Sequence, residues 1–546
     1  MEQSWQLSNT SLGIAFLVAS FVVFYLIGWY SNRASKSVAD LYIAGGTIGP
    51  LANGLGMAST YMSLATFLGV TALILKLQVP FVYMWIQFIL AIPLITILFG
   101  TSLRRMGAFT PAHFVRERYG KTAAVVSACW MILIMLMYAL GQMIGIAKAF
   151  ETLLGIPYAY GLAFGGLLIV GYITLGGMYG ASYNAAFQMV MMGIAFIIPL
   201  GAIMKAMGSS GWWFPPLLYG DMVKSMLEVA PDFFDPKYGV KWYFALIPSL
   251  TLGGIGLPHL AMRVFTASSL RSARAAMVWY ALILGMVFSA TYTMGFAGVY
   301  FSQSTGTVIS PTDADKITII LNLVYNPEWV TALVIVGAIA AGLSTLNGNL
   351  LAIGALVAQD IISTLKPNLA EKSKMVIGYV AIATAGIVSI LLAFKPPAFL
   401  VVSILWAFGL AATVSAPLVI MGVWWKEANK YGAIAASLIA GLVYILVSPY
   451  VAPSITLSGD ALTDKLGLSG ALLSAPLSFI ILIVVSYVTN RIPSLAVRIP
   501  RHETEKLIES IHGWSTVNPM RYNSTAGAFT IAGICAVLVI WALMPW

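Results

Sequence analysis

Long apolar runs separated by short polar segments make up most of the chain. Each run has few charges and is close to the roughly 20 residues that a helix needs to cross the hydrocarbon core of a bilayer. We therefore predict an all-α, polytopic membrane protein with about 14 transmembrane helices. The predicted spans lie near residues 12–30, 50–76, 80–100, 123–149, 157–175, 184–207, 243–266, 274–301, 329–363, 374–394, 397–424, 430–449, 468–489 and 525–545.

Composition excludes a soluble protein. The 546 residues are 60% hydrophobic and 9% charged, whereas a soluble domain carries roughly 25% charged residues. The two cysteines, Cys129 and Cys535, both lie in apolar runs. They are too few for a disulfide framework or a metal cluster, so we interpret them as small packing residues. The chain has no Walker A motif, which indicates that ATP does not drive it.

The positions of the basic residues predict the orientation of the chain in the membrane. The net charge of +10 could suggest nucleic acid, but the lysines and arginines lie in short loops between spans, which argues against a nucleic-acid partner. Placing the N-terminus outside puts most of them on the inner side, as the positive-inside rule requires. The sequence thus predicts a multi-pass protein of the cell membrane with both termini outside. The first run precedes Arg33 and Lys36, so we expect a retained span and not a cleaved signal.

Two spans are interrupted by residues that loosen a helix. Residues 54–63 read GLGMASTYMS, and residues 251–259 read TLGGIGLPH with Pro258. Non-helical backbone inside a bilayer is tolerated only where it lines protein or a watery cavity. The two breaks are five spans apart, and this pattern indicates a secondary transporter built from two inverted halves with a central site. Alternatively, the glycines serve only close helix packing.

The inverted halves predict a division of the chain. Residues 208–242, rich in aromatic residues, prolines and acids, form either a cap over an entrance or an aromatic belt at the headgroups. The predicted parts are an N-terminal helix and loop (1–49), a first repeat (50–207), the outer loop (208–242), a second repeat (243–424) and peripheral helices (425–546).

A third stretch carries candidate cation ligands. Residues 337–347 read GAIAAGLSTLN, and Ala341, Ser344 and Thr345 share one helical face because they are spaced i, i+3 and i+4. Hydroxyl and carbonyl oxygens suit a small monovalent cation such as Na⁺. The alternative is that both hydroxyls bond back to carbonyls of their own helix.

With these stretches in view, the sequence resembles the sodium:solute symporter family, and within it most closely the acetate/monocarboxylate permease branch. The resemblance runs from residue 42 to about Gly441. The motifs that carry it are AGGTIGPLANGLGMASTYMSLATFLG (44–69), QMIGIAK (142–148), ITLGGMYGASYNAAFQ (173–188), GLPHLAMRVFTAS (256–268), AAGLSTL (340–346) and WWKEANKYGAIAASLIAG (424–441).

The resemblance implies a leucine-transporter-type fold with a five-plus-five inverted repeat and Na⁺ as the coupling ion. Thr60 and Tyr61 stand where many members carry an acid, and Ala185 replaces an aspartate, which puts a carboxylate-assisted second cation site in doubt. The implied cation ligands are the carbonyls of Ser59, Met62 and Ala341 and the hydroxyls of Ser344 and Thr345.

The core spans hold almost no charge. Lys148 and Asp360 lie near predicted span ends, where we expect a snorkelling lysine and an inner-face aspartate. Arg263 is counted with an inner loop, so no buried arginine is expected to meet a carboxylate. Free amides and helix N-termini at the two breaks would hold an anion instead. The candidate lining residues are Thr60, Tyr61, Thr66, Trp85, Tyr138, Gln142, Pro258, His259 and Trp406.

Together these features predict a sodium-coupled symporter, not an enzyme, that carries a small organic solute by alternating access. A monocarboxylate such as acetate or pyruvate fits best. The alternatives are another solute of the same family, such as proline, pantothenate or a sugar, or a transporter-like sensor protein. The expected partners are the solute, the sodium ion and the lipid bilayer; the oligomeric state is left unassigned.

Overall fold

The computed structural model consists of helices. It describes residues 7, 10–33, 37–78, 84–209, 215–235, 238–310, 313–396, 400–497, 501–513 and 525–545. Within these ranges there is no β-strand, only one isolated bridge between Ile48 and Ala267. The prediction of an all-α protein is confirmed.

Ten helical stretches are long and apolar enough to cross a membrane in the described part of the chain. Several combine an α-helix with a π-helical or second α-helical segment. They are formed by α1 (Thr10–Asn32), α5–η4–α6 (Met84–Ile95, Thr96–Gly100, Thr101–Met106), α8 (Lys121–Leu154), the second half of α9 (Tyr158–Ala206), α14 (Leu270–Thr305), α16–η8–α17 (Glu328–Ala355, Leu356–Ile362, Ser363–Leu365), α18 (Glu371–Leu392), α19–α20 (Val401–Val414, Ala416–Trp424), α23 (Leu468–Thr489) and α26 (Thr525–Leu543).

Two further spans are bent, at the places where the sequence predicts breaks. The first joins α3 (Pro50–Tyr61) to η2–α4 (Ala65–Gly69, Val70–Leu77) at 56°, and the second joins α11–η6–α12 (Val240–Leu246, Ile247–Leu252, Gly253–Gly256) to α13 (Pro258–Phe265) at 46°. Counting each as one span gives up to 12.

The predicted number of 14 spans is not confirmed. Two shorter apolar helices lie at the remaining two predicted positions, Tyr158–Tyr172 within α9 and α21 (Lys430–Leu446). The break inside α9 falls at Gly177, whose φ of 52° and ψ of −162° suit glycine and few other residues. The other described elements are α2 (Val38–Ile43), η1 (Ala44–Gly46), α7 (Pro111–Tyr119), α10 (Pro215–Val229), η5 (Pro231–Phe234), η7 (Ala314–Lys316), α15 (Ile317–Tyr325), α22 (Ala461–Lys465), α24 (Pro493–Ala496) and α25 (Arg501–His512).

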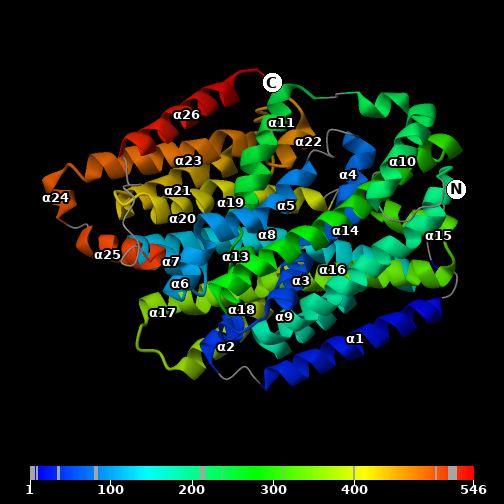
Figure 1. Ribbon diagram of the computed structural model, residues 1–546, viewed down its shortest axis with the longest axis horizontal. Coiled ribbons are helices and arrows are strands. Elements are labelled where there is room, and N and C mark those ends of the chain that lie inside the picture. The colour runs from blue at the N-terminus through cyan, green and yellow to red at the C-terminus, as the bar shows by residue number, and fades with distance from the viewer. Residues whose placement is uncertain are drawn as a thin grey trace.

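The helices lie side by side in one bundle (Figure 1). Most of the apolar core of the α16–α17 and α19–α20 spans is buried, whereas little of that of α1 and α26 is buried. In Figure 1, α1 and α26 accordingly lie along opposite edges of the bundle. The structure therefore places the segment with Ser344 and Thr345 in the middle of the bundle, next to the bent helices.

The described part of the predicted loop 208–242 is largely helical. Helix α10 lies against α14, and Phe233 of η5 packs edge-on against Phe296 of α14 at a centroid distance of 5.1 Å. Met222 and Met226 are buried on the inner side of α10. This segment thus packs onto the bundle as a covering element and is more than a belt of aromatic side chains.

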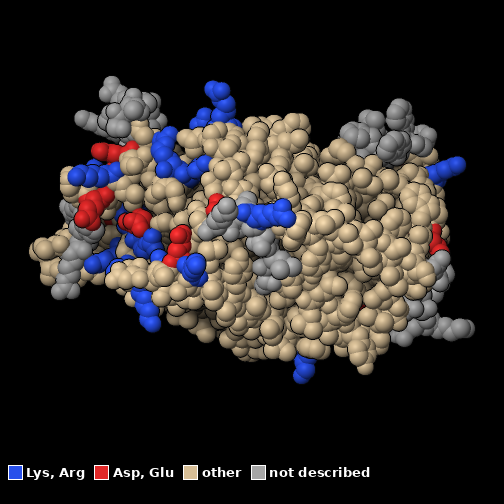
Figure 2. All heavy atoms as spheres, turned by 90° about the horizontal axis from the view of Figure 1, so that it is seen from below, with Lys and Arg blue, Asp and Glu red and all other residues tan. Residues whose placement is uncertain are grey.

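Charged side chains gather at one end of the molecule. Figure 2 shows lysine, arginine, aspartate and glutamate concentrated at the left end, where α6, α7, α24 and α25 lie in Figure 1, and a largely uncharged surface elsewhere. An uncharged band flanked by a charged end is the surface expected of a protein that sits in a bilayer.

At the charged end, His113 of α7 makes stability depend on pH. Its Nδ1 accepts a hydrogen bond from the Phe109 N–H at 3.3 Å. Burial, aided by the Arg116 charge and opposed by Glu117, lowers the pKa of His113 to about 4. The folded state therefore favours the neutral ring. We expect the contribution of His113 to stability to be complete above pH of about 6.5 and to fall as the pH drops towards 4, by up to about 3 kcal/mol.

We expect His113→Gln to flatten this dependence, because glutamine does not titrate and can still accept from Phe109. Thermal unfolding midpoints of the purified protein across this pH range would measure it. Equal acid sensitivity in the variant and the wild type would contradict this assignment to His113.

Candidate functional site: oxygens and unpaired polar groups at two helix breaks

The predicted cation ligands come together where α3 ends against the middle of α16. Ser344 Oγ donates to the Ser59 carbonyl at 2.8 Å and lies 3.0 Å from the Ala341 carbonyl. Thr345 Oγ1 donates to the Thr60 carbonyl at 3.0 Å. Both hydroxyls therefore reach across to the first broken helix, and only Ser344 also bonds within its own helix.

Met62 lies at the break itself, with φ of −74° and ψ of 83°, and its N–H still donates to the Ala58 carbonyl at 2.8 Å. No described hydrogen bond joins the Met62 carbonyl to α16. The gathered oxygens of Ser59, Thr60, Ala341, Ser344 and Thr345 are uncharged, hard ligands, so their chemistry fits a sodium ion. Thr60 joins this group through its carbonyl, which the sequence alone did not indicate.

The first break has few free amides. The Leu64 N–H donates to Gln142 Oε1 at 3.1 Å, and the Ala65 N–H donates to Ser63 Oγ at 3.1 Å. The Ser63 and Thr66 amides bond to nearby carbonyls. The expectation that free amides here would hold an anion is therefore wrong for residues 63–66: the chain satisfies them with its own side chains and carbonyls.

Near the breaks, it is side chains and not the backbone amides of residues 63–66 that lack hydrogen-bond partners in the described structure. Among the described residues, neither ring nitrogen of His259 has a hydrogen-bond partner, and neither does Gln142 Nε2. Both side chains are at most 1% exposed. Buried polar groups without partners are rare in native structures and mark places where a ligand or water binds. These two groups are the strongest candidates for solute contacts.

The second break determines the position of His259. Leu257 has an extended backbone, with φ of −75° and ψ of 117°, because the residue before a proline avoids the helical region. Pro258 then opens α13, and His259 follows in its first turn. The glycines before the break serve packing: a Cβ on Gly253 or Gly256 would lie 2.4 Å from a carbonyl oxygen of α19. Here the packing explanation of the glycines is supported.

His259 lies at the edge of a cluster of aromatic rings. The Tyr138 ring meets the His259 ring edge-on at a centroid distance of 5.2 Å. Phe408 of α19 packs against Tyr138 at 5.8 Å and against Tyr61 at 6.2 Å, and Tyr61 also meets Tyr280 of α14. All five side chains are buried. A solute can reach them only through a change of conformation.

The remaining predicted lining residues are less central. Trp406 points towards α21: its Nε1 donates to Ser448 Oγ at 2.8 Å, and its ring packs on Tyr444. Two positions along a helix turn a side chain by roughly 200°, so Phe408 and Trp406 lie on opposite faces of α19. Thr66 is buried beside the first break, and the side chain of Trp85 lies outside the described part of the structure.

Arg263 is the most important residue that the sequence did not indicate. It lies inside α13, is 1% exposed and is not part of a loop, so the assignment to an inner loop is wrong. Its Nε donates to Thr60 Oγ1 at 3.0 Å and its Nη1 to Ser182 Oγ at 3.0 Å. The predicted span 243–266 already contains Arg263, and its i, i+4 spacing from His259 could have placed it on the same face of that helix.

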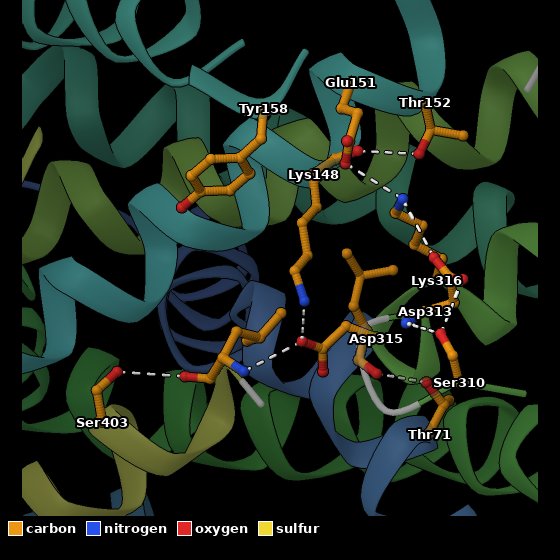
Figure 3. Close-up of polar contacts among 12 residues, drawn as sticks. Thr71, Lys148, Glu151, Thr152, Tyr158, Ser310, Asp313, Asp315, Lys316 and Ser403 are labelled. Carbon is orange, nitrogen blue, oxygen red and sulfur yellow. Dashed lines mark hydrogen bonds and ion pairs between the residues drawn. The ribbon is translucent and has the colours of Figure 1, made fainter. Parts of the chain in front are cut away.

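Lys148 is not a snorkelling side chain. Its Nζ pairs with Asp315 Oδ2 at 2.6 Å, and both side chains are buried. The same carboxylate oxygen accepts the Leu400 N–H at 3.1 Å, so one aspartate joins α8, η7 and the start of α19 (Figure 3). Lys316 forms a more exposed pair with Glu151 beside it. The expectation for Lys148 fails because its partner lies 167 residues away.

Asp360 is likewise fully buried rather than at an open inner face, and its Oδ2 accepts the Thr110 hydroxyl at 2.6 Å. Arg118 is buried too, but its guanidinium donates to the carbonyls of Gly422, Trp425 and Lys426 at the end of α20. A helix C-terminus carries partial negative charge, which compensates this arginine.

The gathered oxygens and bent helices agree with the comparisons. The family model described as "Sodium:solute symporter family" matches residues 41–441. The chain belongs to the sodium:solute symporter family. This membership supports sodium-coupled symport of a solute and a multi-pass membrane location, and it agrees with a protein that is not an enzyme.

A curated relative of this symporter is the "Uncharacterized symporter YwcA" of Bacillus subtilis (strain 168), which is 28% identical over 438 residues, covering 79% of this chain and 84% of the relative. It names no solute. The acetate/monocarboxylate branch therefore has no support from this relative and stays a proposal.

Solved structures show the fold. A Na⁺-coupled sialic acid symporter in a substrate-bound outward-open state has a TM-score of 0.72 at 17% identity, covering 86% of this chain and 98% of that one. Mhp1, a nucleobase-cation-symport-1 family transporter in a closed conformation with bromovinylhydantoin bound, has a TM-score of 0.54 at 15% identity, covering 87% and 99%. The symporter therefore has the leucine-transporter-type fold that the family resemblance implies.

Proposed function

We propose that this symporter couples the entry of Na⁺ to the entry of a small monocarboxylate, such as acetate or pyruvate. The observation that carries the proposal is the pair of buried polar side chains without partners in the described structure, His259 and Gln142. Both can donate hydrogen bonds to a carboxylate.

The charge in this region supports an anion. Arg263 lies one helical turn from His259 on the same face of α13. In the described part of the chain no ion pair joins it to a carboxylate. A buried positive charge without a counter-ion favours a negatively charged ligand nearby. A neutral sugar would leave this charge unbalanced.

We assign Na⁺ to the oxygens of Ser59, Met62, Ala341, Ser344 and Thr345, together with the Thr60 carbonyl. These atoms belong to the first broken helix and to α16, so an ion bound between them stabilises one arrangement of these two helices. Coupling follows when ion and solute both favour that arrangement. In transport, the buried site opens to each side of the membrane in turn.

We also propose the orientation that the sequence predicts, with both termini outside and the charged end in the cytoplasm. The support is that lysines and arginines gather at that end (Figure 2), as the positive-inside rule requires. A tag added after the C-terminus should then be labelled on intact cells. Labelling only after the cells are opened would contradict this orientation.

Uptake into proteoliposomes tests the solute class. We expect labelled acetate and pyruvate to accumulate with an inward Na⁺ gradient and not when K⁺ replaces Na⁺. Empty liposomes control for acetic acid that crosses the bilayer unaided, and pyruvate, the stronger acid, leaks less. Sodium-driven uptake of proline, pantothenate or a sugar without uptake of either acid would overturn the monocarboxylate proposal and leave the sodium coupling intact.

His259 should contribute more to solute binding than Trp406. We expect His259→Phe to raise the KM for the solute at least about tenfold, because one hydrogen bond to a charged group contributes about 1.5–3 kcal/mol. The sodium concentration for half-maximal uptake should change little. Trp406→Phe is the matched control, since this side chain faces α21, and its KM should stay within about twofold of the wild type. Equal effects of the two substitutions would contradict the site.

A further inference from the structure

Arg263 and the candidate cation site share one residue. The Thr60 carbonyl accepts from Thr345 Oγ1 on the side of the cation ligands, and the Thr60 hydroxyl accepts from Arg263 Nε on the other side. The Ser59 carbonyl, one residue earlier, accepts from Ser344 Oγ. The guanidinium is thus a single residue away from the oxygens assigned to Na⁺.

The acceptors around Arg263 are neutral. They are two hydroxyls, of Thr60 and Ser182, and the Ala181 carbonyl at 3.5 Å. Ala181 lies within α9 and far from its C-terminus, so this carbonyl brings no helix-terminal charge. Arg118, the other arginine whose burial is described above, is held by the end of a helix. Among the described residues no carboxylate pairs with Arg263, so it keeps a positive charge without a counter-ion inside the bundle.

Two like charges in a protein interior repel strongly, because the medium between them is less polarisable than water. We propose that Arg263 acts as a fixed cation that lowers the affinity of the adjacent site for Na⁺ and so allows the ion to leave after each transport cycle. This proposal rests on the sodium site of the proposed function. It makes Arg263 a residue that tunes ion binding and not one that ligates the ion.

The repulsion between Arg263 and Na⁺ also couples the binding of Na⁺ to the binding of the solute. An anionic solute beside His259 would lie one helical turn from Arg263 and would offset part of its charge. The site should then hold Na⁺ more tightly when the solute is present, and by reciprocity the ion should tighten solute binding. The positive charge between the two sites is thus one physical route to coupling.

The direction in which sodium affinity changes distinguishes a role in tuning ion binding from a purely structural role of Arg263. If Arg263 only ties α13 to α3 and α9, then Arg263→Gln loosens the site and weakens sodium binding. If its charge repels the ion, then Arg263→Gln strengthens sodium binding, by about tenfold for unit charges in the protein interior. Arg263→Lys keeps the charge, so its affinity should stay within about threefold of the wild type.

The test is equilibrium binding of ²²Na⁺ to the purified symporter, without solute, for the wild type and these two variants. Tighter binding in Arg263→Gln and near-wild-type binding in Arg263→Lys is the expected result. Unchanged or weaker binding in Arg263→Gln overturns the proposal. Ser182→Ala serves as a further control, because it removes a hydrogen bond of Arg263 and keeps both the charge and the cation ligands; a change as large as that of Arg263→Gln would also overturn it.

A second pair of variants decides the matter if Arg263→Gln does not fold. Ser182→Asp places a carboxylate next to Nη1 and neutralises Arg263 where it stands, whereas Ser182→Asn adds similar volume without charge. Only Ser182→Asp should bind ²²Na⁺ more tightly; equal binding in the two variants overturns the proposal. Failure of the sodium site itself has a different signature: the wild type binds no ²²Na⁺, or binding survives Ser344→Ala/Thr345→Ala.

Discussion

Asp315→Asn is expected to lower the free energy of unfolding by about 3–5 kcal/mol, which is the usual effect of removing one partner of a buried ion pair. The substitution leaves the Lys148 ammonium in a buried position without its counter-ion. It also weakens the acceptor for the Leu400 N–H, so three elements lose their common contact. Denaturation of the purified protein, followed by a shift in thermal midpoint or in free energy, measures the loss.

Two controls belong to this prediction. Lys148→Met/Asp315→Leu removes both charges together and should regain most of the stability, because similar apolar residues often replace a buried pair without loss. Lys316→Ala breaks the neighbouring, more exposed pair with Glu151 and should change stability by less than about 1 kcal/mol. If Asp315→Asn is no more harmful than Lys316→Ala, the Lys148–Asp315 pair does not hold this region together.

Ser344→Ala/Thr345→Ala is expected to weaken sodium binding at least about 100-fold, which corresponds to about 1.4 kcal/mol for each hydroxyl removed. The carbonyls of Ser59 and Thr60 remain, but they lose the oxygens that complete the set from α16. Neither substitution changes the fold of α16, since alanine is a strong helix former. Binding of ²²Na⁺ and the sodium dependence of uptake both report the effect.

The matched control is another buried hydroxyl on the same helix. Thr331 of α16 is fully buried and lies more than three turns from Ser344. We expect Thr331→Ala to bind sodium like the wild type. Equal loss in Thr331→Ala and in the double variant would mean that general damage to α16, and not loss of ligands, explains the result.

The sequence predicted the helix breaks because their signals are local. Pro258 forces Leu257 out of the helical region, and the spacing of Ser344 and Thr345 fixes a shared face. The apolar runs indicated the fold class, and the family followed from the motifs that resemble it. The sequence did not show that Gln142 and Ser63 satisfy the amides of the first break, because such contacts depend on how α8 packs against it.

The sequence could not show which charged residues, far apart along the chain, compensate one another. By its position in the sequence Lys148 is a lysine at the end of a span, and only the structure shows that it pairs with Asp315. A positive charge near a span end usually marks a loop, and this rule places Arg263 in one, whereas the residue lies within α13. Trp406 and Phe408 lie on a helix that is apolar on all sides, so periodicity could not show which of the two faces the site.

The central claim is that Na⁺ and the solute move together, and sodium flux driven by the solute tests it most directly. Proteoliposomes hold equal Na⁺ on both sides, with ²²Na⁺ outside, and an inward pyruvate gradient is imposed. The account predicts that ²²Na⁺ accumulates inside transiently, and that Ser344→Ala/Thr345→Ala abolishes the accumulation. Pyruvate entry in the wild type without any movement of ²²Na⁺ would contradict sodium-coupled symport.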